Sequence, residues 1–437
     1  MEVQELLKLY AAHPQVTALD TLLKNDTSRN IFLKGLNGSG PAMTIASLFT
    51  KGRGSYVCVL NDQEEAGYFY HDLMQLTASN EVYFFPSAYR RAIKYGHVDP
   101  ANEILRTEVL SRLQDPDASF VIVTYPDALA ERVVAREVLK ENTLKISVGE
   151  KLDNMFVSDV LDEYGFEQVD YVYEPGQYAV RGSIIDVFSF ASEYPYRIDF
   201  FGDEVESIRT FEVESQLSRE KKEGVSIVPD LAVTGDVTTS FLDFIPKETT
   251  LAMRDFLWLR ERIQVVHDEA LTPQAIAVQE VEENGGITLE GKLIDGSEFT
   301  VRALDFRRLE FGNKPTGTPN ASVTFDTSAQ PIFHKNFDLV AGSFKEYLEK
   351  GYTLYICSDS MKQTDRIRAI FEDRGDKIKF TPVERTVHEG FVDNTLRLCI
   401  FTDHQLFDRF HKYNLKSDKA RSGKVALSLK ELNQFTP

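Results

Sequence analysis

Short apolar runs alternate with amphipathic segments between residues 30 and about 135. Two of the runs are "YVCVL" (56–60) and "FVIVTY" (120–125), and helix-like segments lie between successive runs. Continuous apolar strands separated by helices are typical of a parallel sheet that is buried on both faces. This pattern predicts a doubly wound α/β unit in the first third of the chain.

The pattern changes between about 140 and 218. After a predicted helix at 155–164, strand-like runs such as "SIIDVFSF" and "YRIDFFG" follow one another, separated by the turn signals "EPGQ", "ASEYP" and "GDE". Closely spaced strands with short turns predict an antiparallel sheet and therefore a small α+β insert. The charged run "SREKKEG" (218–224) is interpreted as the exit linker of this insert, with a solvated helix end as the alternative.

The last hundred residues return to an α/β pattern. From residue 334 the sequence predicts a helix, a strand and a second helix, and "LRLCIF" (396–401) supplies another buried strand. We therefore predict four segments: 1–138 and 219–333 as two parts of one unit, 139–218 as the insert, and 334–437 as a small α/β domain with a C-terminal linker.

Composition narrows the class of protein. The 437 residues are 42% apolar and 27% charged, and no apolar run approaches the ~20 residues that cross a membrane. The N-terminus has no basic segment followed by an apolar one, so we expect a cytoplasmic protein without membrane contact. The net charge is 49 − 68 = −19, which argues against wrapping nucleic acid over a broad surface.

Three cysteines, Cys58, Cys357 and Cys399, lie far apart inside apolar runs. Their spacing fits neither a zinc site nor a disulfide framework. We expect them to be buried free thiols that pack as small apolar side chains.

The stretch "FLKGLNGSGPAMT" (32–44) has the glycine spacing of a phosphate-binding loop and lacks its reactive residues. Gly35 and Gly40, with Gly38 between them, match GxxxxGK[ST], but Pro41 and Ala42 replace the Lys and the hydroxyl residue. Pro41 also removes one backbone N–H donor. The sequence predicts a loop on the first strand-to-helix turn that keeps its shape without binding nucleotide.

The most specific stretch is "GQYAVRGSIIDVFSFASEYPYRIDFFGDEVESIRTFE" (176–212). It resembles the UvrA-binding domain shared by the excision-repair protein UvrB and the transcription-repair coupling factors (Mfd), which show "(R/T)RGxxxDxF" followed by "xRxxFFxDExxxxxxFD". The segment "HEGFVDNTLRLCIFTDHQLFDRFHKYN" (388–414) is similar to the coupling factors rather than to UvrB. The resemblance extends over essentially the whole chain.

This resemblance implies a degenerate RecA-like domain with a P-loop-like parallel sheet, split by a UvrA-binding insert and followed by a small α/β domain. In the family, such a module precedes a polymerase-interacting domain and an ATP-dependent translocase of double-stranded DNA. We therefore expect an N-terminal fragment without those parts, which is not itself an enzyme. The expected direct partner is UvrA. RNA polymerase, DNA, ATP and magnesium are expected to bind only the missing domains, and no cofactor or metal is expected here.

The resemblance places UvrA contacts at Arg181, Arg197 and Phe201. Strand alternation agrees, because "YRIDFF" (196–201) sends Arg197 and Phe201 to one face and the core residues to the other. An aromatic side chain beside an arginine on a solvent face is typical of an interface hot spot. The alternative is that Phe201 covers a hydrophobic edge while Arg197 pairs with Asp199 or Glu204.

A second motif supports the loss of ATPase chemistry. The segment "DFIPKETTLAMRDFLWL" (243–259) looks like the counterpart of the acidic, metal-holding motif of UvrB. Arg254 stands where the first acid would be and Asp255 at the second. A positive charge is incompatible with a magnesium ligand.

Other functions stay open at this point. A UvrB-like helicase relative with residual ATPase activity is the main alternative, and a nonspecific DNA-binding module is another. A basic and aromatic cluster could touch single strands but is more simply an ordinary loop, and the basic run 409–424 is more simply a solvated linker. We assign no metal to His267, Asp268 and Glu269, and the remaining histidines show no paired spacing. The residues of the basic and aromatic cluster are Tyr89, Arg90, Arg91, Lys94 and Tyr95.

Overall fold

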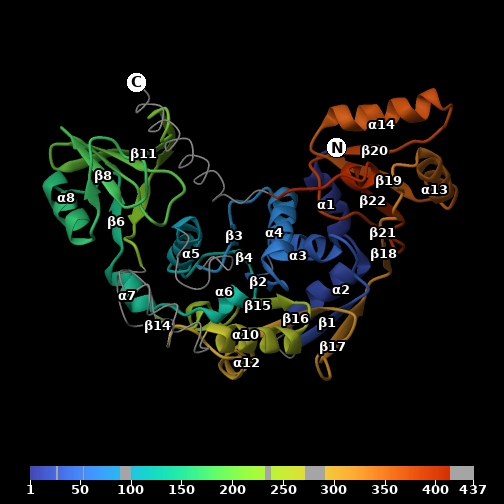
Figure 1. Cartoon of the computed structure of the whole chain (residues 1–437), viewed down its shortest axis with the longest axis horizontal. Coiled ribbons are helices and arrows are strands. Elements are labelled where there is room, and N and C mark those ends of the chain that lie inside the picture. The colour runs from blue at the N-terminus through green and yellow to red at the C-terminus, as the bar shows by residue number, and fades with distance from the viewer. Residues whose placement is uncertain (26–27, 53, 89–99, 232–237, 271–290, 414–437) are drawn as a thin grey trace.

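A computed structural model describes residues 1–25, 28–52, 54–88, 100–231, 238–270 and 291–413. Its largest element is a seven-stranded sheet of order β17-β1-β16-β15-β2-β4-β3, in which every neighbouring pair is parallel. A six-stranded and a five-stranded sheet form two further units. Figure 1 shows these two units at opposite ends of the molecule, with the parallel sheet between them. The predicted α/β fold class, with an antiparallel insert, is confirmed.

The parallel sheet is built by two distant parts of the chain. Figure 1 shows α3 and α4 on one side of it and α6, α10 and α12 on the other. Its strands are β1 (Asn30–Lys34), β2 (Tyr56–Val59), β3 (Val82–Phe84), β4 (Val121–Thr124), β15 (Thr250–Met253), β16 (Arg307–Gly312) and β17 (Ala321–Thr324). The helices of this unit are α1 (Val3–Ala11), α2 (Pro14–Leu23), α3 (Gly40–Thr50), α4 (Gln63–Thr77), α5 (Pro100–Arg112), α6 (Pro126–Ala130), α7 (Arg136–Glu141), α9 (Phe241–Phe244), α10 (Phe256–Ala270) and α12 (Gly296–Ala303).

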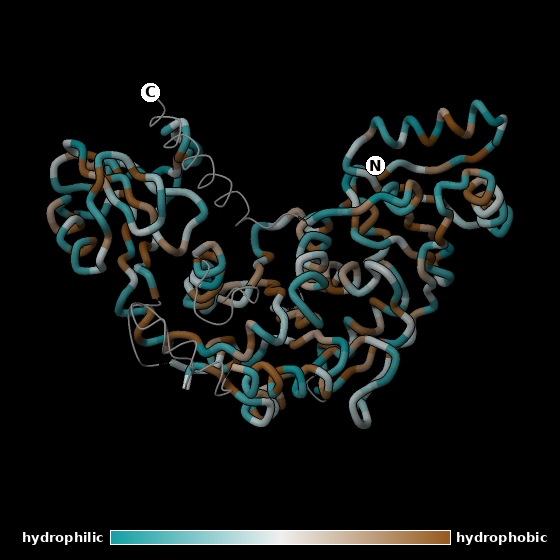
Figure 2. Tube along the Cα trace, viewed as in Figure 1, coloured by the Kyte–Doolittle hydropathy of each residue, from teal (hydrophilic) through white to brown (hydrophobic). Residues whose placement is uncertain are grey.

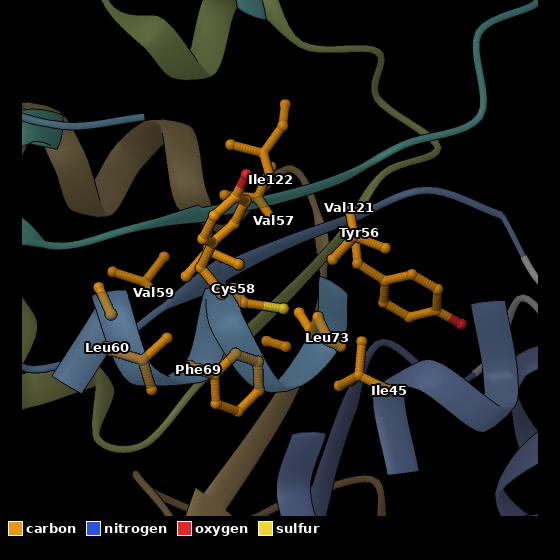
Figure 3. Close-up of a cluster of buried hydrophobic side chains, with 14 of the residues drawn as sticks. Ile45, Tyr56, Val57, Cys58, Val59, Leu60, Phe69, Leu73, Val121 and Ile122 are labelled. Carbon is orange, nitrogen blue, oxygen red and sulfur yellow. The ribbon is translucent and has the colours of Figure 1, made fainter. Parts of the chain in front are cut away.

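Burial on both faces explains why the strand runs are continuously apolar. All four residues of β2 are buried, and Figure 3 shows them among Ile45, Phe69 and Leu73 of the covering helices. Figure 2 shows the same view coloured by hydropathy, with hydrophobic stretches in brown along the segments that Figure 1 draws as strands of this sheet. Cys58 lies in this cluster, and burial raises the pKa of its thiol. The three cysteines are free and buried, as predicted.

The insert is a six-stranded sheet of order β12-β11-β10-β9-β8-β7. Its pairs are antiparallel except β7 with β8. One face packs against α8 (Asn154–Glu163), whose Val157 and Leu161 are buried with Ile185 and Ile198. The strands are β7 (Glu167–Gln168), β8 (Gln177–Arg181), β9 (Ile184–Val187), β10 (Tyr196–Phe201), β11 (Glu204–Phe211) and β12 (Ser218–Lys222).

The interpretation of residues 218–224 as a linker or a helix end is wrong. Residues Ser218–Lys222 form the edge strand β12, which pairs with β11. Their charged side chains suit a strand at a sheet edge, because charge there discourages pairing with another chain. Two short pairs lie between the insert and the parallel sheet: β6 (Leu144–Ser147) with β13 (Gly224–Ile227), and β5 (Val133–Val134) with β14 (Thr238–Thr239). The domain boundaries given above stay predictions.

The third unit has a five-stranded sheet of order β18-β21-β22-β19-β20. Two of its pairs are parallel and two antiparallel. Its elements are β18 (Thr327–Ala329), α13 (Phe337–Glu349), β19 (Thr353–Ser358), α14 (Met361–Asp373), β20 (Thr381–Glu384), β21 (Phe391–Asp393), β22 (Leu398–Thr402) and α15 (Asp403–Leu406). The predicted order of helix, strand and helix after residue 334 is therefore correct.

A buried carboxylate joins the third unit to the parallel sheet. Asp72 of α4 accepts one hydrogen bond from the backbone N–H of His388, at 2.7 Å, and another from the hydroxyl of Ser39. The Ser39 hydroxyl in turn accepts from the backbone N–H of Glu389, at 3.0 Å. Burial raises the pKa of Asp72 to about 7, although the hydrogen bonds from Ser39 and His388 act in the opposite direction.

The Asp72 contact predicts a specific pH dependence of stability. A folded-state pKa above the unfolded value gives stability that is present at low pH and lost as the pH rises through about 7. Asp72→Asn removes this titration. The free energy of unfolding of the variant minus that of the native chain should therefore be more positive at pH 8 than at pH 5.5, by on the order of 1 kcal/mol. Urea unfolding at both pH values measures it. The control is Asp373→Asn, which changes an exposed aspartate. The prediction is contradicted if the unfolding free energy of Asp72→Asn differs from that of the native chain by the same amount at both pH values.

Candidate functional site

The sheet register of the insert places the three predicted contact residues on its second face. Arg197 in β10 lies opposite Asp186 in β9, and Arg181 in β8 lies opposite Ile184. Ile198 and Phe200 alternate with them along β10 and are buried against α8. One face of β10 thus supplies core residues, and the other is left for polar side chains and Phe201.

Asp186 holds both arginines. Its carboxylate is fully buried and takes two hydrogen bonds from Arg197, Nε to Oδ1 at 2.7 Å and Nη2 to Oδ2 at 2.8 Å. Arg181 Nη2 also donates to Oδ2. Two guanidinium groups share one carboxylate, so these three side chains together carry an excess positive charge. Hydrogen bonding to Asp186 raises the pKa of Arg197.

The two arginines differ in how much of the side chain stays accessible to a partner. The Arg197 side chain is 16% exposed, and its guanidinium stacks 4.5 Å above the ring of the buried Phe211 and donates to the carbonyl of Gln216. Arg181 is 37% exposed and lies over Tyr171, at 5.3 Å. Arg197 is therefore a fixed part of the face, whereas Arg181 can offer hydrogen bonds to a partner.

Phe201 is the exposed apolar side chain at the end of this face. It is 78% exposed at the last position of β10. The chain then turns through Gly202, whose positive φ of 65° a glycine adopts at no steric cost. Since Phe201 is largely in water, its apolar surface is available to a partner.

The alternative pairing expected for Arg197 is wrong. Asp199 pairs with Arg209 at 3.3 Å instead, and Arg197 turns to Asp186. The role of Asp186 was not predicted from the sequence. The only signal was the acidic position in "RGSIIDVF", which strand pairing alone brings opposite Arg197.

The glycine loop follows β1 and leads into α3, as predicted, but protein atoms occupy its backbone donors. The N–H of Asn37 donates to Thr327 Oγ1 and that of Ser39 to the carbonyl of Glu389, both at 3.0 Å. The N–H of Gly40 donates to the carbonyl of Asn37 at 2.9 Å. These are donors that a phosphate-binding loop would direct at its ligand.

The glycines of the loop are explained by close backbone approach. A Cβ on Gly35 would lie 2.1 Å from the carbonyl oxygen of Phe325, and one on Gly38 would lie 2.7 Å from that of Gly390. Both residues also have positive φ, of 82° and 52°. Pro41 and Ala42 are buried in the first turn of α3. The loop is therefore a structural turn against the third unit.

A cleft of about 360 Å³ lies beside this loop. Among the described residues that line it, five are acidic and one, Arg254, is basic. The acidic residues are Asp62, Glu64, Glu65, Asp72 and Glu389. The carboxylates of Asp62, Glu64, Glu65 and Glu389 repel phosphate groups, and within the described lining only Arg254 carries the opposite charge.

Arg254 and Asp255 have structural roles. Arg254 pairs with Glu65, Nε to Oε1 at 2.7 Å. Asp255 accepts from the N–H of Trp258 at 2.9 Å and so caps the start of α10. Neither side chain is arranged with the other to hold a metal, and no group of three or more His, Cys, Asp or Glu within the described residues could hold one.

The remaining candidates give no site. The cluster at residues 89–95 lies outside the described residues, as does the basic run from 414 onward. His267 contacts the neighbouring Asp268 at 3.1 Å. None of the helices in the described part of the chain is long and apolar enough to span a membrane.

Comparison with known proteins agrees with this geometry. Residues 144–232 match the family model of the UvrB interaction domain. This range contains the whole six-stranded sheet with Arg181, Asp186, Arg197 and Phe201.

Curated relatives extend the match over most of the chain. The transcription-repair-coupling factor of Bacillus subtilis is 20% identical over 92% of this chain and 40% of its own length. Those of Escherichia coli and Haemophilus influenzae are 29% and 31% identical over 44% and 43% of this chain, and 17% and 16% of their own lengths. The chain spans less than half the length of these relatives. It is thus related along most of its length to the transcription-repair-coupling factors and carries a UvrB interaction domain.

Proposed function

We propose that this chain recruits UvrA to RNA polymerase stalled at a DNA lesion, as the N-terminal module of a transcription-repair coupling factor. It binds UvrA through the second face of its insert and performs no catalysis itself. ATP, magnesium, DNA and RNA polymerase are bound by other parts of the longer protein, which acts as a translocase of double-stranded DNA in the cytoplasm.

This proposal rests on the face of the insert that contains Arg181, Arg197 and Phe201, in which Asp186 pairs with both arginines. It combines a half-exposed arginine, a fixed arginine and a phenylalanine that is 78% exposed, all within the range of the UvrB interaction domain. Arg and aromatic side chains are enriched in interface hot spots. Asp186 already holds both arginines without a partner, so binding costs little side-chain entropy at these two residues.

The alternative function, residual ATPase activity, meets two obstacles in the same unit. The backbone donors of the glycine loop are occupied by Thr327 and Glu389. The adjacent cleft is lined by acidic side chains. Removing one obstacle would leave the other in place.

Substitutions on the binding face should abolish capture of UvrA. Arg181→Glu and Arg197→Glu reverse the charge of the face, and Phe201→Ala removes its apolar contact. Each should weaken binding by about 2 kcal/mol or more, roughly thirtyfold. Equilibrium titration of labelled UvrA measures this, with circular dichroism as the check on folding.

Matched controls lie in the third unit. Arg368→Glu reverses an exposed arginine on α14, and Phe410→Ala removes a phenylalanine that is 75% exposed. Both should bind UvrA like the native chain. Retention of native affinity by the folded Arg181, Arg197 and Phe201 variants would reject the proposed face.

Asp186 should act as a positioning residue. Asp186→Asn keeps the side-chain volume but removes the shared counter-charge, so it should lower the stability of the insert by about 3 kcal/mol and weaken UvrA binding. If Asp186 acts through Arg197, the double variant with Arg197→Gln should bind no more weakly than Arg197→Gln alone.

The control for Asp186 is Asp199→Asn on the same face, where the carboxylate is 23% exposed and paired with Arg209. It should change UvrA affinity little. Full additivity of the two losses in the double variant would show that Asp186 does not work through Arg197.

The chain should not bind ATP. Titration of a fluorescent ATP analogue with magnesium should give no saturable signal, and no phosphate release should be detected, because the loop donors are occupied and the cleft is acidic. Saturable binding in the micromolar range with turnover would favour the UvrB-like ATPase alternative.

A further inference from the structure

Four histidines, one distant in the sequence from the other three, meet where the end of the third unit crosses α4. They are His71 of α4, His388 after β20, His404 of α15 and His411. The ring of His411 lies 4.5 Å from that of His404, 5.1 Å from that of His71 and 5.9 Å from that of His388, measured between ring centroids. His411 is thus the centre of the cluster.

His411 belongs to residues 407–413, here called the strap, which lie against α4. The hydroxyl of Tyr68 donates to the carbonyl of His411 at 2.7 Å. The ring of Tyr413 packs directly over Gly67, where a Cβ would lie 2.3 Å from it. The absence of a side chain at Gly67 therefore allows the strap to reach the helix.

The surroundings of the four rings favour neutral imidazoles. The Nδ1 atom of each of the four rings is buried and has no hydrogen-bond partner among the described residues. Burial, followed by repulsion from the neighbouring histidines, lowers the pKa of His388 to about 4 and that of His411 to about 3. Burial also lowers the pKa of His71 and His404. An added proton on His71, His388 or His411 would find no acceptor at Nδ1, and on His404 it would find only Asp403 Oδ1, at 3.9 Å. It would also repel the neighbouring ring if that ring were charged.

The charged groups around the cluster only partly oppose the lowering of the histidine pKa values. Asp359 favours the charged form of His71 and His404, and Asp403 favours that of His404, but Asp403 is already paired with Arg409 at 2.6 Å. Other charged groups nearby are Glu64 and Asp72 on α4, Glu389 beside His388, and Lys412 on the strap. Asp72 is itself protonated near pH 7, so it offers little negative charge as the pH falls.

We propose that this cluster is a proton-operated latch, in which acidification charges the stacked imidazoles and releases the strap from α4 while the three sheets stay folded. The direction of the pH effect follows from the difference between the histidine pKa values in the docked and released states. A docked-state pKa below the ordinary value of 6.5 gives docking that is fully stable above pH 6.5 and is lost as the pH falls towards 4. Release uncovers Tyr68 and opens the cavity of about 440 Å³ between α4 and the strap, which Phe410 and Tyr413 line from the strap side.

The latch can be tested with a fluorophore on the strap. Lys412→Cys provides a single exposed thiol for an environment-sensitive dye, because the three native cysteines are buried. Titration of the whole chain from pH 8 to 4 should give one reversible change with a midpoint below about 6.5. Far-UV circular dichroism should stay constant over the same range.

A variant should identify the titrating group. His411→Phe keeps an aromatic ring against its neighbours and removes one protonation site, so the transition should shift to lower pH by roughly half a unit or more and become less steep. His388→Phe serves the same purpose if the first variant does not fold. His267→Gln, on α10 and outside the cluster, should leave the transition unchanged.

Three results would overturn the latch. The first is a dye signal that stays constant down to pH 4 in the native background. The second is an unchanged transition in the folded His411→Phe and His388→Phe variants. The third is loss of circular dichroism at the same midpoint, which would mean that the whole chain unfolds.

Discussion

The structure depends on the contact that fills the glycine loop. Ser39 and Glu389 exchange two hydrogen bonds, and the buried Asp72 of α4 accepts from the Ser39 hydroxyl and from the backbone N–H of His388. Because backbone donors must be satisfied when they are buried, a loop without a phosphate needs another partner. The third unit supplies that partner. The loop that would hold a nucleotide is therefore a joint between two units, and its glycines are required by the approach of Phe325 and Gly390.

A second buried carboxylate organises the other end of the molecule. Asp186 lies among three strands of the insert and fixes Arg197 by two hydrogen bonds while also reaching Arg181. A buried charge is tolerable only when it is paired, so the carboxylate enforces the position of the arginines as much as they stabilise it. The third unit and the insert stand at opposite ends of the parallel sheet (Figure 1). The glycine loop and the proposed UvrA-binding face therefore lie in different parts of the molecule.

The fold could be predicted where local pattern and burial agree. The alternation of apolar runs and helices gave the parallel sheet, because β1, β2 and β4 are buried on both faces and contain few polar residues. The edge strand β12 was mistaken for a linker, since an exposed strand needs no apolar residues and its charges look like those of a loop. Periodicity cannot tell these apart without knowledge of the neighbouring strand.

The sites were predictable to different degrees. Arg197 and Phe201 share a face because strand alternation fixes it, whereas the partner of Arg197 depends on the register between β9 and β10 and could not be read from spacing. The histidine cluster was missed for the same reason: His71, His388 and His411 have no common spacing, and only tertiary packing brings them together. Contacts between distant segments are where sequence patterns carry least information.

The most direct test of the recruitment role is the hydrogen-exchange footprint of UvrA on this chain. Binding through the insert predicts slower amide exchange in β9 and β10, from Ile184 to Phe201, and no change in the glycine loop at 35–44. Protection confined to the glycine loop and the adjoining acidic cleft, with β9 and β10 unchanged, would contradict the account.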